Sequence, residues 1–174
     1  MSAALRARRT DLVISRWQAR FLGRIFPCAV GRSGIIAASA KREGDGATPA
    51  GRYRILSVFG RHDRAKMPEG AILSPLKLVW CDDPSDPRYN QGMLAASAAG
   101  HPERLRRSDP LYDLVAVIDH NWPDPQPGYG SAIFLHCWRK PRHPTAGCVA
   151  FARVDLDWIL RRWSPSSRVV IGAV

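Results

Sequence analysis

A histidine and a cysteine stand at the ends of two apolar segments in the last third of the chain. His136 closes the run IFLH at 133–136, and Cys148 opens the run CVAF at 148–151, with eleven residues of loop between them. If the two runs form adjacent strands, the two side chains lie on the same side of the sheet. A thiolate is a nucleophile, and a neighbouring imidazole can take its proton and return it to a leaving group. The spacing therefore indicates a thiol nucleophile with its base.

The loop between the two segments carries residue types that suit such a site. Gly147 leaves room for a substrate carbonyl and lets successive backbone N–H groups point one way, as in an oxyanion hole. Arg139, Lys140 and Arg142 could lower the pKa of the thiol or hold a substrate carboxylate. Trp138 is expected to line the site.

Spacing alone leaves other interpretations open. On spacing alone, a small core cysteine and a strand-end histidine with a satisfied hydrogen bond are favoured over a catalytic pair. A metal group of His136, Cys137, His143 and Cys148 matches no zinc signature, and the chain contains no CxxC. A disulfide between Cys137 and Cys148 would consume the nucleophile.

Alternating apolar runs and turn clusters predict a mainly β fold, a sandwich or partly closed barrel. Clusters of Gly, Pro and Asp separate the expected strands. These strands cover residues 12–17, 20–26, 34–39, 52–58, 76–80, 113–119, 131–136, 148–151 and 168–174. The stretch from about 60 to 110 has little strand pattern and is expected to form a loop-rich cap over the sheet.

One clear helix is expected near the C-terminus, at 154–165. Four apolar residues follow helical spacing, namely Leu156, Ile159, Leu160 and Trp163. Asp155 is expected to cap its start and Pro165 to end it. A second helix is expected over 93–107.

Length and charge set broad limits on the function. The 174 residues, 45% of them hydrophobic, predict a single globular domain over 1–174. No apolar run approaches a membrane-spanning length, and Arg16 and Arg20 interrupt the only segment resembling a secretory signal. The net charge of +11 favours an anionic partner such as nucleic acid, lipid or wall polymer, or reflects arginine enrichment without a partner.

The sequence resembles the L,D-transpeptidase catalytic domains of the YkuD type. The segments IFLH and TAGCV resemble the catalytic signature of that family, an apolar strand ending in His followed by Ser or Thr, any residue, Gly, Cys and an aliphatic residue. Upstream, KREGDGATPAGRYRI resembles the hairpin of the family. The segments LYDLVAVIDHN and WCDDP…YN resemble the insertion of a bacterial subgroup. The resemblance covers about residues 12–174 and implies a β-sandwich-like domain.

Carried onto this chain, the resemblance implies a role for each residue of the motif. Cys148 would be the nucleophile, and His136 the general base, oriented by the backbone carbonyl of Cys137. The N–H groups of Gly147 and Cys148 would bind the oxyanion, and Thr145 would brace the loop at the substrate site. Ala146 and Ala150 depart from the family, many members of which have His and Arg there, so the basic loop is expected to supply the carboxylate anchor.

The expected function is peptidoglycan L,D-transpeptidation through an acyl-enzyme thioester, in the periplasm or cell envelope. The expected partners are stem peptides, with no nucleic acid, no membrane span, no metal and no cofactor, and the chain is expected to be a monomer. Two alternatives stay open: a carboxypeptidase or amide hydrolase with the same Cys-His chemistry, and a non-catalytic basic module that binds nucleic acid or glycan.

Overall fold

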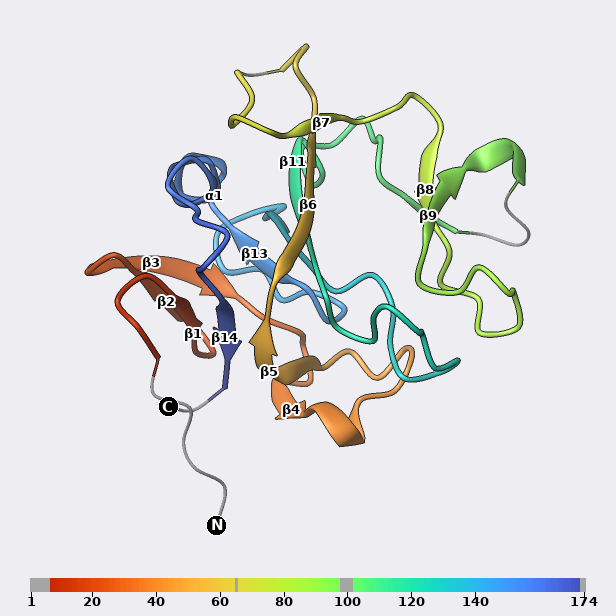
Figure 1. Ribbon diagram of the computed structural model, residues 1–174, viewed down its shortest axis with the longest axis horizontal. Coiled ribbons are helices and arrows are strands. Elements are labelled where there is room, and N and C mark those ends of the chain that lie inside the picture. The colour runs from red at the N-terminus through yellow and green to blue at the C-terminus, as the bar shows by residue number, and fades with distance from the viewer. Residues whose placement is uncertain (1–6, 65, 98–101, 173–174) are drawn as a thin grey trace.

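The computed structural model describes residues 7–64, 66–97 and 102–172 (Figure 1). Within these ranges the helical elements are η1 (Ala38–Ala40), η2 (Ala95–Ser97) and α1 (Arg153–Leu160). The strands are β1 (Leu12–Ile14), β2 (Gln18–Phe21), β3 (Arg24–Ala29), β4 (Ile35–Ala37), β5 (Thr48–Tyr53), β6 (Ile55–Gly60), β7 (Ile72–Leu73), β8 (Leu78–Trp80), β9 (Gly92–Leu94), β10 (Glu103–Arg104), β11 (Leu114–Ile118), β12 (Phe134–Cys137), β13 (Val149–Phe151) and β14 (Val169–Ile171).

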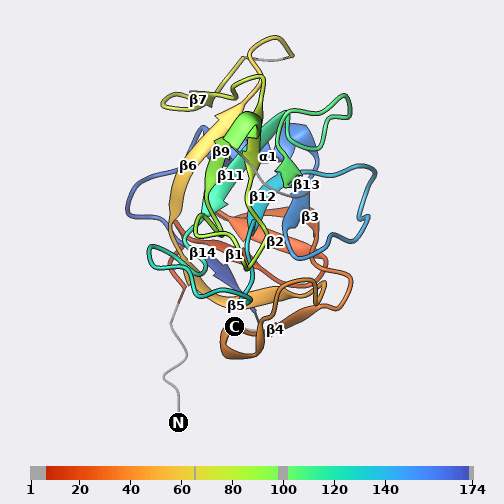
Figure 2. The same ribbon diagram turned by 90° about the vertical axis from the view of Figure 1, so that its right-hand side faces the viewer.

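Most of the strands join one long, strongly curved sheet in the order β4-β5-β14-β1-β2-β3-β13-β12-β11-β6-β7. In Figure 2 the sheet folds over itself, with β1, β2, β3 and β14 lying below β11, β12 and β13. The content of 34% strand and 8% helix, with one α-helix, confirms the mainly β, sandwich-like prediction. Among the described helices, none has the length and apolar character that crossing a membrane requires.

Helix α1 closes the main core between the two parts of the sheet. Leu156, Ile159 and Leu160 are buried in that core, and the Trp158 ring packs 5.4 Å from the ring of Phe26. Apolar spacing alone was enough to predict this helix, because the same stripe that repeats every three or four residues faces the sheet.

The predicted ends of this helix were wrong. Its N-cap is Ala152, without a side-chain hydrogen bond, and its last residue is Leu160, well before Pro165. The chain leaves β13 at Phe151 and turns directly into the helix, so Asp155 falls inside the first turn. There its carboxylate still interacts favourably with the helix dipole.

The three central strands β11, β12 and β13 are buried on both faces. Successive side chains of a strand point to opposite faces. One face, formed by Leu114, Ala116, Ile118, Leu135, Cys137, Val149 and Phe151, belongs to the main core. The other face carries Val115, Val117, Phe134 and Cys148 in a second, smaller cluster.

The cap expected at about 60–110 covers this second face. It contains β7, which joins the edge of the main sheet, and a separate three-stranded sheet in the order β10-β8-β9. Leu78, Trp80 and Leu105 pack in the second cluster with Val115 and Phe134. In Figure 1, β8 and β9 stand to the right of the main sheet. The cap is therefore an ordered wall rather than loop alone.

The second helix predicted over 93–107 was wrong. The described parts of that range form the end of β9, one 3-10 turn in η2 and strand β10, and residues 98–101 lie outside the described part. Alanine-rich composition favours a helix locally, but pairing with β8 and the breaker Pro102 decide otherwise.

The strand predicted over 20–26 is in fact a hairpin. Leu22 and Gly23 both adopt positive φ, at 49° and 82°, and connect β2 to β3. Two consecutive left-handed residues give a tight turn whose twist matches that of the paired strands. Leucine is unusual in such a turn, so Gly23 was the only residue in the sequence that indicated a turn here.

Candidate active site

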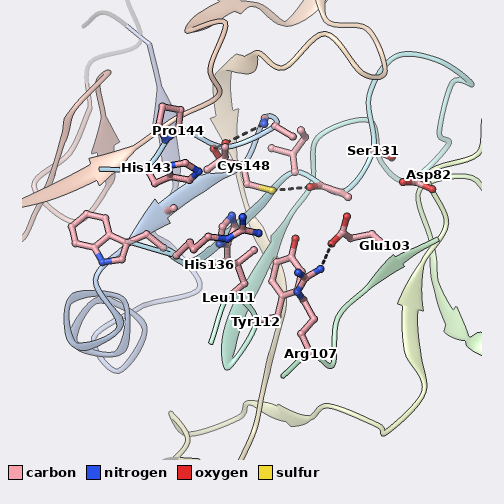
Figure 3. A pocket seen from close by; sticks show the side chains of 18 of the residues that line it. Asp82, Glu103, Arg107, Leu111, Tyr112, Ser131, His136, His143, Pro144 and Cys148 are labelled. Atoms are coloured by element: carbon pink, nitrogen blue, oxygen red, sulfur yellow. Dashed lines mark hydrogen bonds and ion pairs between the residues drawn. The ribbon is translucent and has the colours of Figure 1, made fainter. Parts of the chain in front are cut away.

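The pairing of β12 with β13 brings the predicted nucleophile and base to one cavity. The two strands run parallel, with Leu135 opposite Val149 and His136 opposite Ala150. Alternation then directs the side chains of His136 and Cys148 to the second face of the sheet, beneath the cap. Both side chains line a cavity of about 350 Å³ (Figure 3).

The imidazole of His136 is fixed in one tautomer. Its Nδ1 lies 2.7 Å from the backbone oxygen of Cys137, the contact that the resemblance implied. A carbonyl only accepts hydrogen bonds, so Nδ1 carries the proton and Nε2 keeps its lone pair. The ring of Tyr112 packs edge-on against the imidazole at 5.3 Å. His136 is thus presented to the cavity as a neutral base.

Burial keeps the His136 side chain uncharged at neutral pH. Desolvation lowers the pKa of His136 to about 4, and the nearby Arg107 acts in the same direction. The hydrogen bond to Cys137 and the carboxylate of Asp109 oppose this shift. The base is therefore ready to accept a proton at neutral pH, and it holds the proton weakly.

The thiol of Cys148 is half-buried at the cavity wall. Its Sγ donates a hydrogen bond to the carbonyl oxygen of Ala132 at 3.1 Å, and among the described residues no hydrogen bond joins it to His136. Burial raises the pKa of the Cys148 thiol to about 12. At neutral pH the two groups therefore rest as thiol and neutral imidazole, not as an ion pair.

The charges around the thiol differ from those that we expected. The N–H of Phe134 and the ammonium of Lys41 lower the thiol pKa, while Glu103 raises it. Arg139, Lys140 and Arg142 were the predicted cations near the thiol. The cation that lowers the thiol pKa is instead Lys41, about a hundred residues earlier in the chain.

Two threonines brace the turn before the cysteine. Thr145 Oγ1 donates to the Cys148 carbonyl at 2.6 Å, and the Gly147 N–H donates to Thr145 Oγ1 at 3.1 Å. Thr48 is fully buried, and its Oγ1 donates to the Gly147 carbonyl at 2.8 Å while accepting the N–H of Gly31 at 2.8 Å. The TPAG segment therefore supports the nucleophile turn directly.

Position 147 requires glycine for a conformational reason, which differs from the predicted role in substrate access. Its φ is +152°, and a Cβ there would lie 3.1 Å from the carbonyl oxygen of Ala47. Its N–H, which we expected to face an oxyanion, donates to Thr145 in the resting structure. Glycine thus lets two backbone segments approach each other behind the cysteine.

The cavity has walls of both charges. The cations Lys41, Arg107 and Arg139 and the acids Glu43, Asp82 and Glu103 line it. In Figure 3, Glu103 and Asp82 lie across the cavity from His143 and Pro144. Burial raises the pKa values of both Asp82 and Glu103. Asp82 and Glu103 come from the cap, and Glu43 comes from the loop before β5.

The basic loop divides between two sides of the molecule. Trp138 and Arg139 line the cavity with His136 and Cys148. Arg142 does not; it lines a separate surface hollow with Trp17 and adopts a left-handed φ of 58°. The left-handed residue reverses the loop, and no pattern in the sequence indicated that turn.

The structure brings together several residues that sequence reasoning missed. Tyr112, Glu103, Lys41 and Thr48 contact or support the pair, and Asn90 holds the Ala132 peptide. Lys41, Thr48, Asn90 and Tyr112 lie in the segments that resemble the family, but their spacing gave no indication that they meet at the site.

The disulfide and metal interpretations of the cysteines find no geometric support. All four cysteines are free thiols, and Cys137 points into the main core, on the face opposite to Cys148. Within the described ranges, no three His, Cys, Asp or Glu side chains gather as a metal-binding group.

Comparison with known proteins gives one match. The sequence model of the YkuD family, described as the L,D-transpeptidase catalytic domain, matches residues 7–171, which include both strands of the candidate site and the cap. No curated protein and no solved structure was found to match.

The buried histidine predicts a specific loss of stability in acid. The folded state binds the His136 proton only near pH 4, whereas the unfolded chain binds it near the ordinary value of 6.5. As the pH falls from 7 to 5, the unfolded state takes up the proton first and gains stability. Between these pH values the free energy of unfolding should fall by about 2 kcal/mol more for wild type than for His136→Gln. Urea unfolding of both proteins at both pH values measures this difference, and equal losses would contradict it.

Proposed function

The chain belongs to the YkuD family of L,D-transpeptidase catalytic domains, and from this premise we propose that it cross-links peptidoglycan stem peptides through a thioester on Cys148. The observation that carries the proposal is the shared cavity of Cys148 and His136, on the same face of two paired strands. A thiol and a neutral imidazole in one cavity supply the nucleophile and the base that acyl transfer needs.

The first half-reaction forms the thioester. Substrate entry displaces the thiol from Ala132, and its proton passes to Nε2 of His136 as sulfur attacks the carbonyl of the L-centre residue in the donor stem. The backbone N–H of Cys148 stabilises the oxyanion, and Gly147 contributes its N–H only if it leaves Thr145. The terminal D-amino acid departs with the proton that His136 returns to its nitrogen.

The second half-reaction transfers the acyl group. An amine of the acceptor stem attacks the thioester, and His136 accepts a proton from that amine. The C–S bond breaks, and sulfur recovers its proton from His136. The fixed Nδ1–H to Cys137 contact supports both steps, because Nε2 alone is left to exchange protons.

The charged walls suit a peptide with both free amino and carboxylate groups. Arg139 supplies a cation in the cavity wall, and Glu43, Asp82 and Glu103 supply acids in the same wall. We propose the periplasm or cell envelope as the site of action, since the substrate is found there. The basic composition suits an anionic wall polymer.

Carbapenem labelling tests the nucleophile. Wild type should gain the mass of one carbapenem, because the β-lactam carbonyl acylates the thiol, and Cys148→Ala should gain none. His136→Ala should be acylated at least about a hundredfold more slowly than wild type, because a general base usually contributes that much to the rate. Intact-mass spectrometry measures all three proteins.

Cys28→Ala is the matched control for this labelling, since Cys28 is a fully buried thiol on β3 and should not be the site of the adduct. An unlabelled, folded wild type would favour a non-catalytic binding module. Mass analysis of products from purified muropeptides then distinguishes transpeptidation, which gives dimers, from hydrolysis, which gives shortened monomers.

Arg139 and Arg142 form a matched pair for testing substrate binding. Arg139 lines the cavity, and Arg142, three residues later, lines the separate hollow. Arg139→Ala should raise the half-saturating concentration of stem peptide about tenfold, the worth of one charge-assisted hydrogen bond, with a smaller effect on the maximal rate. Arg142→Ala should behave as wild type in the same steady-state assay. Equal effects of the two substitutions would refute a carboxylate anchor at Arg139.

A further inference from the structure

A buried asparagine of the cap holds the peptide group that precedes the carbonyl facing the nucleophile. Asn90 is 5% exposed, and its Oδ1 accepts hydrogen bonds from the Ala132 N–H at 3.1 Å and from Trp80 Nε1–H at 3.0 Å. Its Nδ2 donates to the carbonyls of His120 at 3.2 Å and Asn121 at 3.0 Å. Both partners of Oδ1 are pure donors and both partners of Nδ2 are pure acceptors, so the orientation of the amide is determined.

Ala132, whose N–H is held in this way, has a backbone conformation that needs support from its surroundings. Ala132 adopts a φ of +51°, and Asn90 itself adopts +59°. Asparagine tolerates the left-handed region, but alanine rarely enters it, because its Cβ approaches the carbonyl oxygen. Such a residue persists only where its surroundings fix it. The hydrogen bond from the Ala132 N–H to Asn90 is a contact that does so.

The consequence reaches the sulfur. Asn90 holds the N–H of the Ser131–Ala132 peptide, and the left-handed Ala132 then places the carbonyl oxygen of the next peptide 3.1 Å from Cys148 Sγ. The chain of contacts runs from the cap through Asn90 and Ala132 to the thiol, without passing through His136.

We propose that Asn90 is a positioning residue for the nucleophile: it fixes the Ala132 carbonyl, which holds the Cys148 thiol protonated and in place at the cavity wall until substrate arrives. The inference rests on the proposed function only in taking Cys148 as the nucleophile. It gives the cap a part in the reaction, since Asn90 and Trp80 both belong to that insertion.

Two measurable properties follow from this arrangement. A carbonyl can accept a hydrogen bond from a thiol but not from a thiolate, so the contact favours the protonated form, and its loss should move the ionisation of Cys148 to lower pH. A thiol that is no longer held should also attack from a poorer starting geometry, which lowers the maximal acylation rate and leaves binding unchanged.

The test compares Asn90→Gly with two controls. Glycine keeps the left-handed backbone and removes the side chain. Asn121→Gly is the matched control, because Asn121 also has a positive φ and its Nδ2 bridges Gln126 and Gly130 instead of Ala132. Trp80→Phe removes the other donor to Asn90 Oδ1 but leaves the contact with Ala132.

Two readouts apply to every variant. Iodoacetamide alkylation of Cys148, followed by peptide mass mapping across a pH series, gives the ionisation midpoint of the thiol. Carbapenem acylation gives the maximal rate and the half-saturating concentration. Cooperative thermal unfolding identifies the folded proteins, and Asn90→Ser, whose shorter side chain does not reach the Ala132 N–H, replaces Asn90→Gly if that variant does not fold.

Asn90→Gly should shift the alkylation midpoint to lower pH and reduce the maximal acylation rate about tenfold, with a half-saturating concentration within about twofold of wild type. The two controls should match wild type in both assays. The proposal is overturned if Asn90→Gly matches wild type, or if Trp80→Phe or Asn121→Gly produces the same changes. If wild type takes up no carbapenem, the proposed function fails, while the alkylation series still decides whether Asn90 sets the state of the thiol.

Discussion

The parallel pairing of β12 with β13 is the constraint on which the rest of the site depends. Each strand is only three or four residues long and is buried on both faces, so the register alone decides which side chains reach the cavity. In the observed register, Leu135 and Val149 fill the main core, and His136 and Cys148 face the cap. A slip of one residue in either strand would send its polar group into the core and expose an apolar side chain in its place. The main core therefore fixes the positions of His136 and Cys148 from the opposite side of the sheet.

Contacts from distant parts of the chain stabilise the surroundings of the two side chains that this register positions, His136 and Cys148. Thr48 connects the start of β5 to the turn before the cysteine, and Asn90 connects the cap to the N–H of Ala132, whose carbonyl faces the thiol. The imidazole depends on a local contact, the carbonyl of the next residue, Cys137. The site is thus assembled from three separate segments on a rigid pair of strands, which is the arrangement that a reaction sensitive to small displacements requires.

The sequence was sufficient where a local pattern and the burial of side chains agree. The apolar runs at β11, β12 and β13, the stripe of α1 and the motif around Cys148 all combine strong periodicity with a position in the core. It was insufficient where tertiary contacts override local preference. Residues 93–94 pair with β8 and 95–97 form only a 3-10 turn instead of the predicted α-helix, and Leu22 lies in the turn of a hairpin. Arg139 and Arg142 are indistinguishable by composition, and only the left-handed turn at Arg142 separates them. Lys41 and Asn90 act on the thiol across long stretches of chain, and spacing in a single sequence carries no signal of such contacts.

The most direct measurement of the central claim is intact-mass analysis of the protein after rapid acid quenching during turnover with a stem tetrapeptide as donor. The account predicts a transient species heavier than the free protein by the mass of the donor peptide less the mass of the released free D-amino acid, mapped to the peptide that contains Cys148. Cys148→Ala should form no such species under the same conditions. Product formed without any covalent intermediate on wild type, or an acyl group mapped to another residue, would contradict the account.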